Sequence, residues 1–217
     1  MEVDTLWTPP TVGRRGRPAL TRGAIVEAAV GVADAGGLDA VSMPRLARTV
    51  GAAPMSLYRH VPHKEALLAL MVDHAIGPAP DLAGTGRREG FARWARANRQ
   101  VFRAHPWTLP LVTGTLRMGP AECGWAEVFL AHGTGHGLEP GEALVVLMTV
   151  NAFVRGASTP IGDRVPSADA IEAAGRGDDY PHLLGLLRGD GADEATDPDD
   201  AMFEAGLEIV LGGREPA

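Results

Sequence analysis

Residues 42–64 read SMPRLARTVGAAPMSLYRHVPHK, and this stretch decides the fold. Ser42 is suited to cap a helix, and Pro44 is tolerated in the first turn, where backbone amides have no intrahelical partner. Gly51 fits the left-handed position that follows such a helix. Pro54 then fits the first turn of a second, very short helix. The stretch therefore predicts two short helices joined by a tight turn.

The second short helix separates buried from exposed residues clearly. Leu57 and Val61 are four apart and are expected to face a core. Its remaining side chains offer a thioether, a hydroxyl, a phenol, a guanidinium and an imidazole to solvent, from Met55, Ser56, Tyr58, Arg59 and His60. Such groups on an exposed helix suit the major groove of DNA, so we predict a helix-turn-helix.

Residues 21–73 resemble the DNA-binding domain of TetR-type transcriptional regulators, through the runs AIVEAA, LARTVG and SLYRHVPHKEALL. Ala53 and His63 stand where that family commonly has capping residues, which should weaken each helix start by up to about 1 kcal/mol. The resemblance implies DNA contacts from both short helices and the next helix start. These positions are Ser42, Met43, Pro44, Pro54, Met55, Ser56, Tyr58, Arg59, His60 and Lys64.

Residues 1–20 contain three prolines and no apolar periodicity, so we expect them to be disordered. They include RRGRP, in which Arg14, Arg15 and Arg17 form a basic arm. This arm is similar to the minor-groove motif of AT-hook proteins, because narrow A·T-rich grooves attract inserted arginines. We predict that the arm contacts DNA beside the helix-turn-helix.

Charge is divided unevenly along the 217 residues, whose net charge is −7. Residues 11–64 carry eight Lys or Arg and three acids, whereas residues 65–217 carry 12 and 22. A basic module joined to an acidic body fits DNA binding by the first part. The single cysteine excludes an internal disulfide framework. No signal peptide or membrane-length apolar run is visible, so a cytoplasmic protein is expected.

Residues 67–217 are predicted to form a larger helical bundle that follows the helix-turn-helix domain of residues 21–66. Apolar periodicity favours helices at 63–76, 87–104, 140–155 and 200–211. The runs HPWTLPLV, DDYPHLLGLL and MFEAGLEIVLGG resemble the ligand-binding domain of the tetracycline-repressor-like branch of the family. The fold class is therefore all-α, with about nine to ten helices in total.

Helical bundles hold small molecules between facing helices, in sites that are mostly apolar with a few polar groups. Aromatic, soft and amide residues of this domain are candidates to line such a site for an unknown effector. They are Trp94, Asn98, Phe102, His105, Trp107, Trp125, Phe129, Met148 and Asn151. Each is as well suited to an ordinary core, although Asn98 and Asn151 need polar partners.

Residues 140–155 have apolar side chains nearly all round the predicted helix, more than one bundle face can use. The last predicted helix offers a second apolar stripe. We predict that these faces pair two copies of the chain, through Leu144, Leu147, Val154, Phe203, Leu207 and Val210.

Metal and cofactor sites are not predicted. His132 and His136 are four apart, but glycines lie between them and no acidic or cysteine cluster accompanies them. No nucleotide-binding or catalytic motif is present in the sequence.

The combined prediction is a homodimeric DNA-binding regulator that a small molecule releases from a pseudopalindromic operator. Repression rather than activation follows from the family resemblance. Two alternatives remain open at this point. One is a non-inducible DNA-binding dimer, and the other is a helical enzyme with a basic face.

Overall fold

The computed structural model describes residues 6–8, 20–114, 116–159, 165–189 and 198–212, and within these ranges every regular element is a helix. The predicted all-α class is confirmed. The described residues form eleven α-helices, slightly more than the nine to ten predicted. The chain divides into two compact units, residues 1–158 and 159–217.

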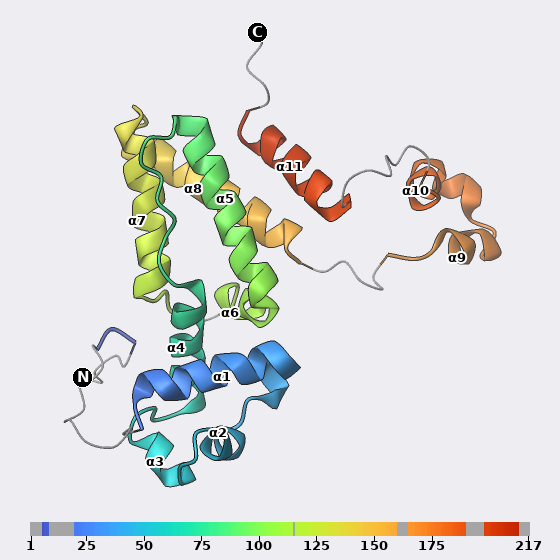
Figure 1. Cartoon of the computed structure of the whole chain (residues 1–217). Coiled ribbons are helices and arrows are strands. Elements are labelled where there is room, and N and C mark those ends of the chain that lie inside the picture. The colour runs from blue at the N-terminus through green and yellow to red at the C-terminus, as the bar shows by residue number, and fades with distance from the viewer. Residues whose placement is uncertain (1–5, 9–19, 115, 160–164, 190–197, 213–217) are drawn as a thin grey trace. The chain divides into compact units, whose positions relative to one another are not determined.

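Three helices form the N-terminal group: α1 (Arg22–Gly36), α2 (Met43–Thr49) and α3 (Pro54–Tyr58). A 3-10 turn, η1 (Leu38–Ala40), precedes α2. Thr21 Oγ1 accepts a hydrogen bond from the amide of Ala24 at 3.1 Å, which caps α1. Figure 1 shows the three helices in blue and cyan at one end of the first unit.

The turn between α2 and α3 follows the predicted local chemistry. Ser42 Oγ accepts from the amide of Arg45 at 3.4 Å. Gly51 has a φ of 65°, which only glycine adopts readily. Leu46 and Leu57 are fully buried where α2 and α3 pack together. The helix-turn-helix is thus held by one cap, one glycine and a shared apolar contact.

Helix α4 (Lys64–Ile76) joins the N-terminal group to the bundle. The start of α4 is capped, contrary to expectation. His63 Nδ1 accepts a hydrogen bond from the amide of Ala66 at 3.1 Å. Helix α4 packs against α1 on one side and α7 on the other (Figure 1). The predicted domain boundary at residues 66–67 falls inside this continuous helix.

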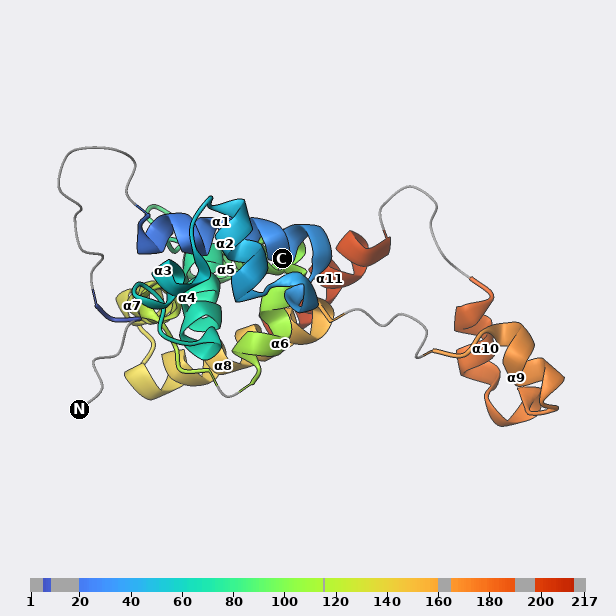
Figure 2. The ribbon, with the colours of Figure 1, turned by 90° about the horizontal axis from the view of Figure 1, so that it is seen from below.

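The bundle of the first unit consists of α5 (Arg87–Ala104), α7 (Pro120–Gly135) and α8 (Pro140–Ala157). Between α5 and α7 lie a 3-10 turn, η2 (Pro106–Thr108), and the short α6 (Leu109–Val112). Helices α5, α7 and α8 pack against one another. Seen from below, α1, α2 and α3 gather around α4 (Figure 2).

The second unit contains α9 (Ala168–Ala173), a 3-10 turn η4 (Gly177–Asp179), α10 (Pro181–Leu187) and α11 (Pro198–Val210). Ile171 and Leu184 are buried, and α9 packs against α10. The last helix begins two residues before the predicted residue 200, at Pro198, a residue well suited to a first helical turn.

Candidate DNA-binding face and ligand cavity

Helix α3 presents the side chains that the sequence assigns to DNA. Leu57 and Val61 are fully buried and fix the helix to the N-terminal core. Met55 is 74% exposed and Tyr58 is 43% exposed. Arg59 and Pro54 are also exposed, whereas Ser56 and His60 are half-buried. The face therefore exposes a guanidinium, a phenol and a thioether to solvent, and their contact with a DNA groove stays a prediction.

The start of α2 differs from the prediction at one residue. Ser42 and Pro44 are exposed, but Met43 is buried in the N-terminal core. Met43, Leu46 and Ala47 are spaced at i, i+3 and i+4, so they share the inward face of α2. Met43 accordingly packs in the core, and the exposed Ser42 and Pro44 are the better placed DNA-contact candidates at this helix start.

Lys64 is exposed in the first turn of α4, in keeping with its predicted role as a DNA contact. Arg45 and Arg48 are further exposed cations, on the outer face of α2, which that analysis did not assign to DNA. Arg45 and Arg48 are three residues apart, so they share the helix face opposite the buried Leu46 and Ala47. This spacing could have identified them as exposed cations from the sequence. The basic arm of Arg14, Arg15 and Arg17 lies outside the described residues.

A cavity of about 360 Å³ lies within the first unit, among the end of α4, the helices α5, α6, α7 and α8, and Met118. Six of the predicted ligand residues line it: Trp94, Asn98, Phe102, Trp125, Met148 and Asn151. The sequence analysis missed the aliphatic and charged part of the wall. That part comprises Ile76, Val101, Val112, Met118, Glu122, Ala126, Leu130, Leu144, Leu147 and Arg155.

Polar groups are few in the cavity wall and lie in two places. Asn98 Nδ2 on α5 donates to Asn151 Oδ1 on α8 at 3.5 Å. Burial raises the pKa of Glu122 above its usual 4.5, although the Gly119 amide and the positive charge of Arg155 oppose that shift. The wall thus combines an amide pair, one carboxyl group and one guanidinium with a mostly apolar surface.

Hydrogen bonds connect the cavity wall to the end of α4. Trp94 Nε1 donates to the carbonyl of Trp125 at 3.0 Å, and Trp125 Nε1 donates to the carbonyl of Gly77 at 3.1 Å. Asp73 Oδ1 accepts from the amide of Ala121 at 2.7 Å, in the first turn of α7. The cavity wall and the C-terminal end of α4 are therefore joined by hydrogen bonds.

Comparison with known proteins agrees with this geometry. Residues 25–71 match the model of the tetR family of bacterial regulatory proteins. Residues 79–216 match the model of the tetracyclin repressor-like C-terminal domain. The chain belongs to the TetR family.

Relatives and solved structures in this family cover nearly the whole chain. The repressor DrrR1 of Streptomyces coeruleorubidus is 32% identical, over 98% of this chain and 84% of that protein. The class A tetracycline repressor from transposon 1721, of Escherichia coli, is 29% identical over 87% of this chain and 88% of its own. Streptomyces coelicolor ActR, solved in complex with actinorhodin, has a TM-score of 0.71 at 27% identity, covering 89% of this chain and 95% of ActR. This TetR-family chain is a DNA-binding transcriptional regulator.

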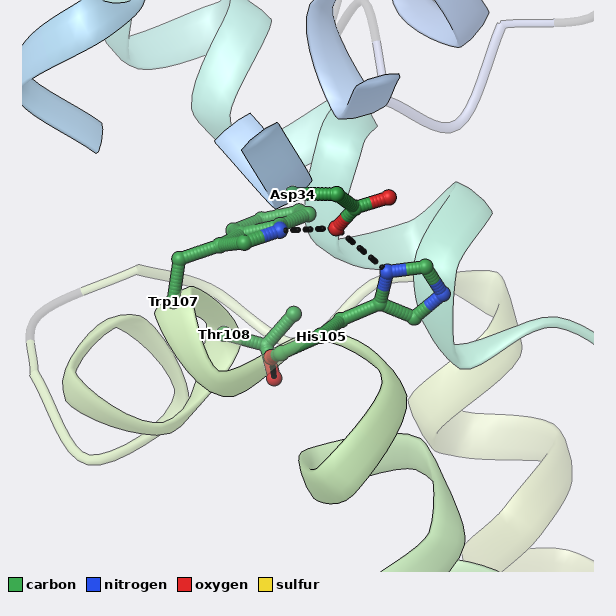
Figure 3. A network of polar contacts seen from close by, with 4 residues as sticks. All are labelled: Asp34, His105, Trp107 and Thr108. Carbon is green, nitrogen blue, oxygen red and sulfur yellow. Dashed lines mark hydrogen bonds and ion pairs between the residues drawn. The ribbon is translucent and has the colours of Figure 1, made fainter. Parts of the chain in front are cut away.

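Three predicted ligand residues lie elsewhere in the TetR fold. Phe129 stacks on Phe91 with ring centroids 4.4 Å apart, inside the bundle core. His105 and Trp107 turn away from the cavity toward α1, where both contact Asp34 (Figure 3). Periodicity identifies a residue as inward-facing but does not say which interior it enters, so it could not show that these three lie outside the cavity wall.

Most residues predicted for the TetR-type dimer contact are already buried in the single chain. Leu147, Val154, Phe203 and Leu207 are each at most 8% exposed, so they have little surface left for a partner. Leu144 and Val210 retain exposed area. The apolar side chains that the helices leave in solvent are their neighbours, namely Val145 and Met148 on α8 and Met202 and Ile209 on α11.

His132 and His136 have structural roles in the described chain. His132 Nε2 lies 3.2 Å from the carbonyl of Arg87, and His136 Nδ1 lies 2.9 Å from the carbonyl of His132. Among the described residues, no group of three or more His, Cys, Asp or Glu is placed to hold a metal ion. None of the described helices is both long and apolar enough to cross a membrane.

Proposed function

We propose that this TetR-family regulator is a homodimeric repressor that leaves its operator when a small molecule fills the bundle cavity. The observation that carries the proposal is the position of that cavity. It includes Ile76 at one end of α4, and the other end of α4 begins at the exposed Lys64 beside α3. One helix of about 20 Å thus spans the distance between the two sites.

The cavity wall indicates the chemical character of the effector. Its surface is mostly aliphatic and aromatic, so most of the molecule should be apolar. The amide pair of Asn98 and Asn151 offers a hydrogen-bond acceptor and donor at one place. Glu122 and Arg155 offer opposite charges at another. An apolar molecule with hydrogen-bonding groups at two separated positions fits this wall, and actinorhodin, with which ActR has been solved, is the first compound to test.

Homodimerisation follows from the requirement for two reading helices on a two-fold symmetric operator. The exposed apolar residues of α8 and, separately, those of α11 are the two surfaces we assign to it. An effector that prefers the conformation with the wrong separation of the two α3 helices lowers operator affinity. Near-complete switching needs a preference of roughly 5 kcal/mol.

The experiment is a titration of the full-length protein on DNA that flanks its own coding region, with and without each compound of a panel. Compounds that raise the thermal midpoint of the protein should also weaken operator binding. Linkage then requires the same compound to bind more weakly when operator is present. Equal affinities with and without operator, for every compound that binds, would leave a non-inducible DNA-binding protein.

A further inference from the structure

A tryptophan of the bundle segment is part of the hydrophobic core of the DNA-binding helices. Trp107 belongs to η2, which follows α5, yet it is 6% exposed and packs in the core built by α1 to α4. Ile25, Leu46 and Leu57 are members of that same core. The N-terminal group is therefore not packed independently of the bundle.

Polar contacts fix this tryptophan to the last turn of α1. Asp34 Oδ1 accepts from Trp107 Nε1 at 2.6 Å, and it lies 2.8 Å from His105 Nδ1 (Figure 3). Thr108 is fully buried, and its hydroxyl donates to the carbonyl of His105 at 2.7 Å. One carboxylate oxygen thus holds two side chains of a short turn that is itself internally hydrogen-bonded. We call Asp34, His105 and Trp107 the α1 joint.

Residues that shortly precede and shortly follow this turn in the sequence line the ligand cavity. Phe102 lines the cavity from the last turn of α5, two residues before that helix ends at Ala104. Val112 lines it from the end of α6. Only a few residues separate each of them from the α1 joint. A molecule that displaces either side chain pushes on the segment that carries His105 and Trp107.

We propose that the α1 joint couples the cavity to the DNA-binding helices, by a route through α1 that is separate from α4. The proposal rests on the proposed function and specifies how the cavity is read. When the wall at Phe102 or Val112 moves, η2 moves with it because the chain joins them. Its side chains must then either part from Asp34 or draw α1 along.

Parting Trp107 from Asp34 leaves the indole N–H of the buried Trp107 without a partner and opens a void in a packed core, although the exposed Asp34 carboxylate can turn to water. Moving η2 and α1 as one body keeps both hydrogen bonds and the packing. The second response is therefore favoured, and it shifts the N-terminal core on which α3 is anchored. By reciprocity, operator binding at α3 must alter the cavity wall.

The test is hydrogen–deuterium exchange of the full-length protein with and without an operator duplex, so that no effector needs to be known. Two segments are compared, residues 54–58 of α3 and residues 102–113 of the cavity wall. In the wild type, operator should slow exchange in both segments. In Asp34→Ala, operator should still slow exchange in α3, but its effect on residues 102–113 should be lost.

Two matched variants separate coupling from a merely structural role. Asp34→Asn keeps an oxygen that accepts from both partners, so it should retain the operator effect on residues 102–113. Asp39→Ala removes another exposed carboxylate from the same group of helices and should behave as the wild type. A structural role alone would raise exchange equally in free and bound Asp34→Ala and leave the operator-induced difference intact. That result overturns the proposal.

The remaining outcomes are also decisive. If Asp34→Ala does not fold, Trp107→Phe keeps a ring in the core, removes the N–H donor, and should reduce the operator-induced difference at residues 102–113. If the operator-induced difference at residues 102–113 is as large in Trp107→Phe as in the wild type, the coupling role of the α1 joint is contradicted. A wild type that binds operator but shows no change at residues 102–113 refutes the joint and leaves the proposed function standing. A wild type that binds no operator refutes the proposed function itself.

Discussion

Replacing Lys64 and Arg59 separately should distinguish contacts to phosphates from contacts to bases. Lys64 is exposed in the first turn of α4, and a dimer presents it twice. If each copy neutralises one phosphate, Lys64→Ala removes two ionic contacts from the complex. The slope of log K against log salt should then become shallower by about 1.8, since each contact contributes about 0.9. Base preference should stay unchanged.

Arg59 is exposed directly after α3, on the face that carries Met55 and Tyr58. An arginine on a base edge contributes roughly 1–3 kcal/mol of discrimination. Arg59→Ala should therefore lower the preference for one base pair in each half-site by roughly 5- to 150-fold. The other base pairs of the site should keep their preferences.

The assay is selection of bound sequences from a random duplex pool, followed by dissociation constants over a range of salt concentrations. Arg88→Ala serves as the control, because Arg88 is an exposed arginine in the first turn of the bundle helix α5. It should leave both the selected sequence and the salt slope unchanged. An unaltered selected sequence for Arg59→Ala, or an unaltered slope for Lys64→Ala, would refute the assignment of the residue concerned.

Four further changes test other parts of the account. Met43→Ala should destabilise the protein by about 2–5 kcal/mol, measured by urea unfolding, without altering the selected sequence; an altered sequence at normal stability would restore Met43 as a DNA contact. Because burial raises the folded-state pKa of Glu122, its stability contribution is complete below about pH 4.5 and is lost as pH rises. Glu122→Gln should accordingly melt higher than the wild type near neutral pH, and this difference should vanish as pH falls toward about 4.5; a difference that is constant with pH contradicts the cause assigned to the shift. Val145→Arg, on the exposed face of α8 and outside the cavity wall, should yield monomers in sedimentation, and an intact dimer would exclude that face. Deleting residues 14–17 should weaken operator binding and flatten its salt dependence, whereas unchanged values would exclude the arm.

Local chemistry made the helix-turn-helix predictable from sequence. Ser42, Gly51 and Pro54 each act through backbone groups within a few residues, so their effects do not depend on the rest of the fold. The four-residue spacing of Leu57 and Val61 identified the inward face, and both are fully buried. Charge separation and family resemblance together located the DNA-binding part of the chain.

The interior of the bundle was predictable only in part, because periodicity shows that a residue faces inward but not what covers it. Phe102 and Trp107 looked alike in sequence, yet one lines the cavity and the other enters the DNA-binding core. Val154 looked suited to a dimer and is covered within its own chain. Glu122 could have been found from its spacing to Trp125 and Phe129, at i, i+3 and i+7 on α7.

The cap at the start of α4 was not predicted from the sequence. His63 was expected to be a poor cap because its family position commonly carries Asn, Ser or Asp. A neutral imidazole has one ring nitrogen without a proton, and Nδ1 accepts the amide of Ala66 in the same way as a carboxamide oxygen. Average preferences for helix caps do not predict that one particular rotamer of His can cap a helix in this way.

Footprinting on the DNA that flanks the coding region can show whether the protein is a repressor released by its effector. The full-length protein should protect two half-sites related by two-fold symmetry, with centres about one helical turn or a multiple of it apart. Protection should disappear when a compound that fills the cavity is added. Uniform weak protection along the fragment, or two half-sites that persist with the cavity filled, would contradict a repressor released by its effector.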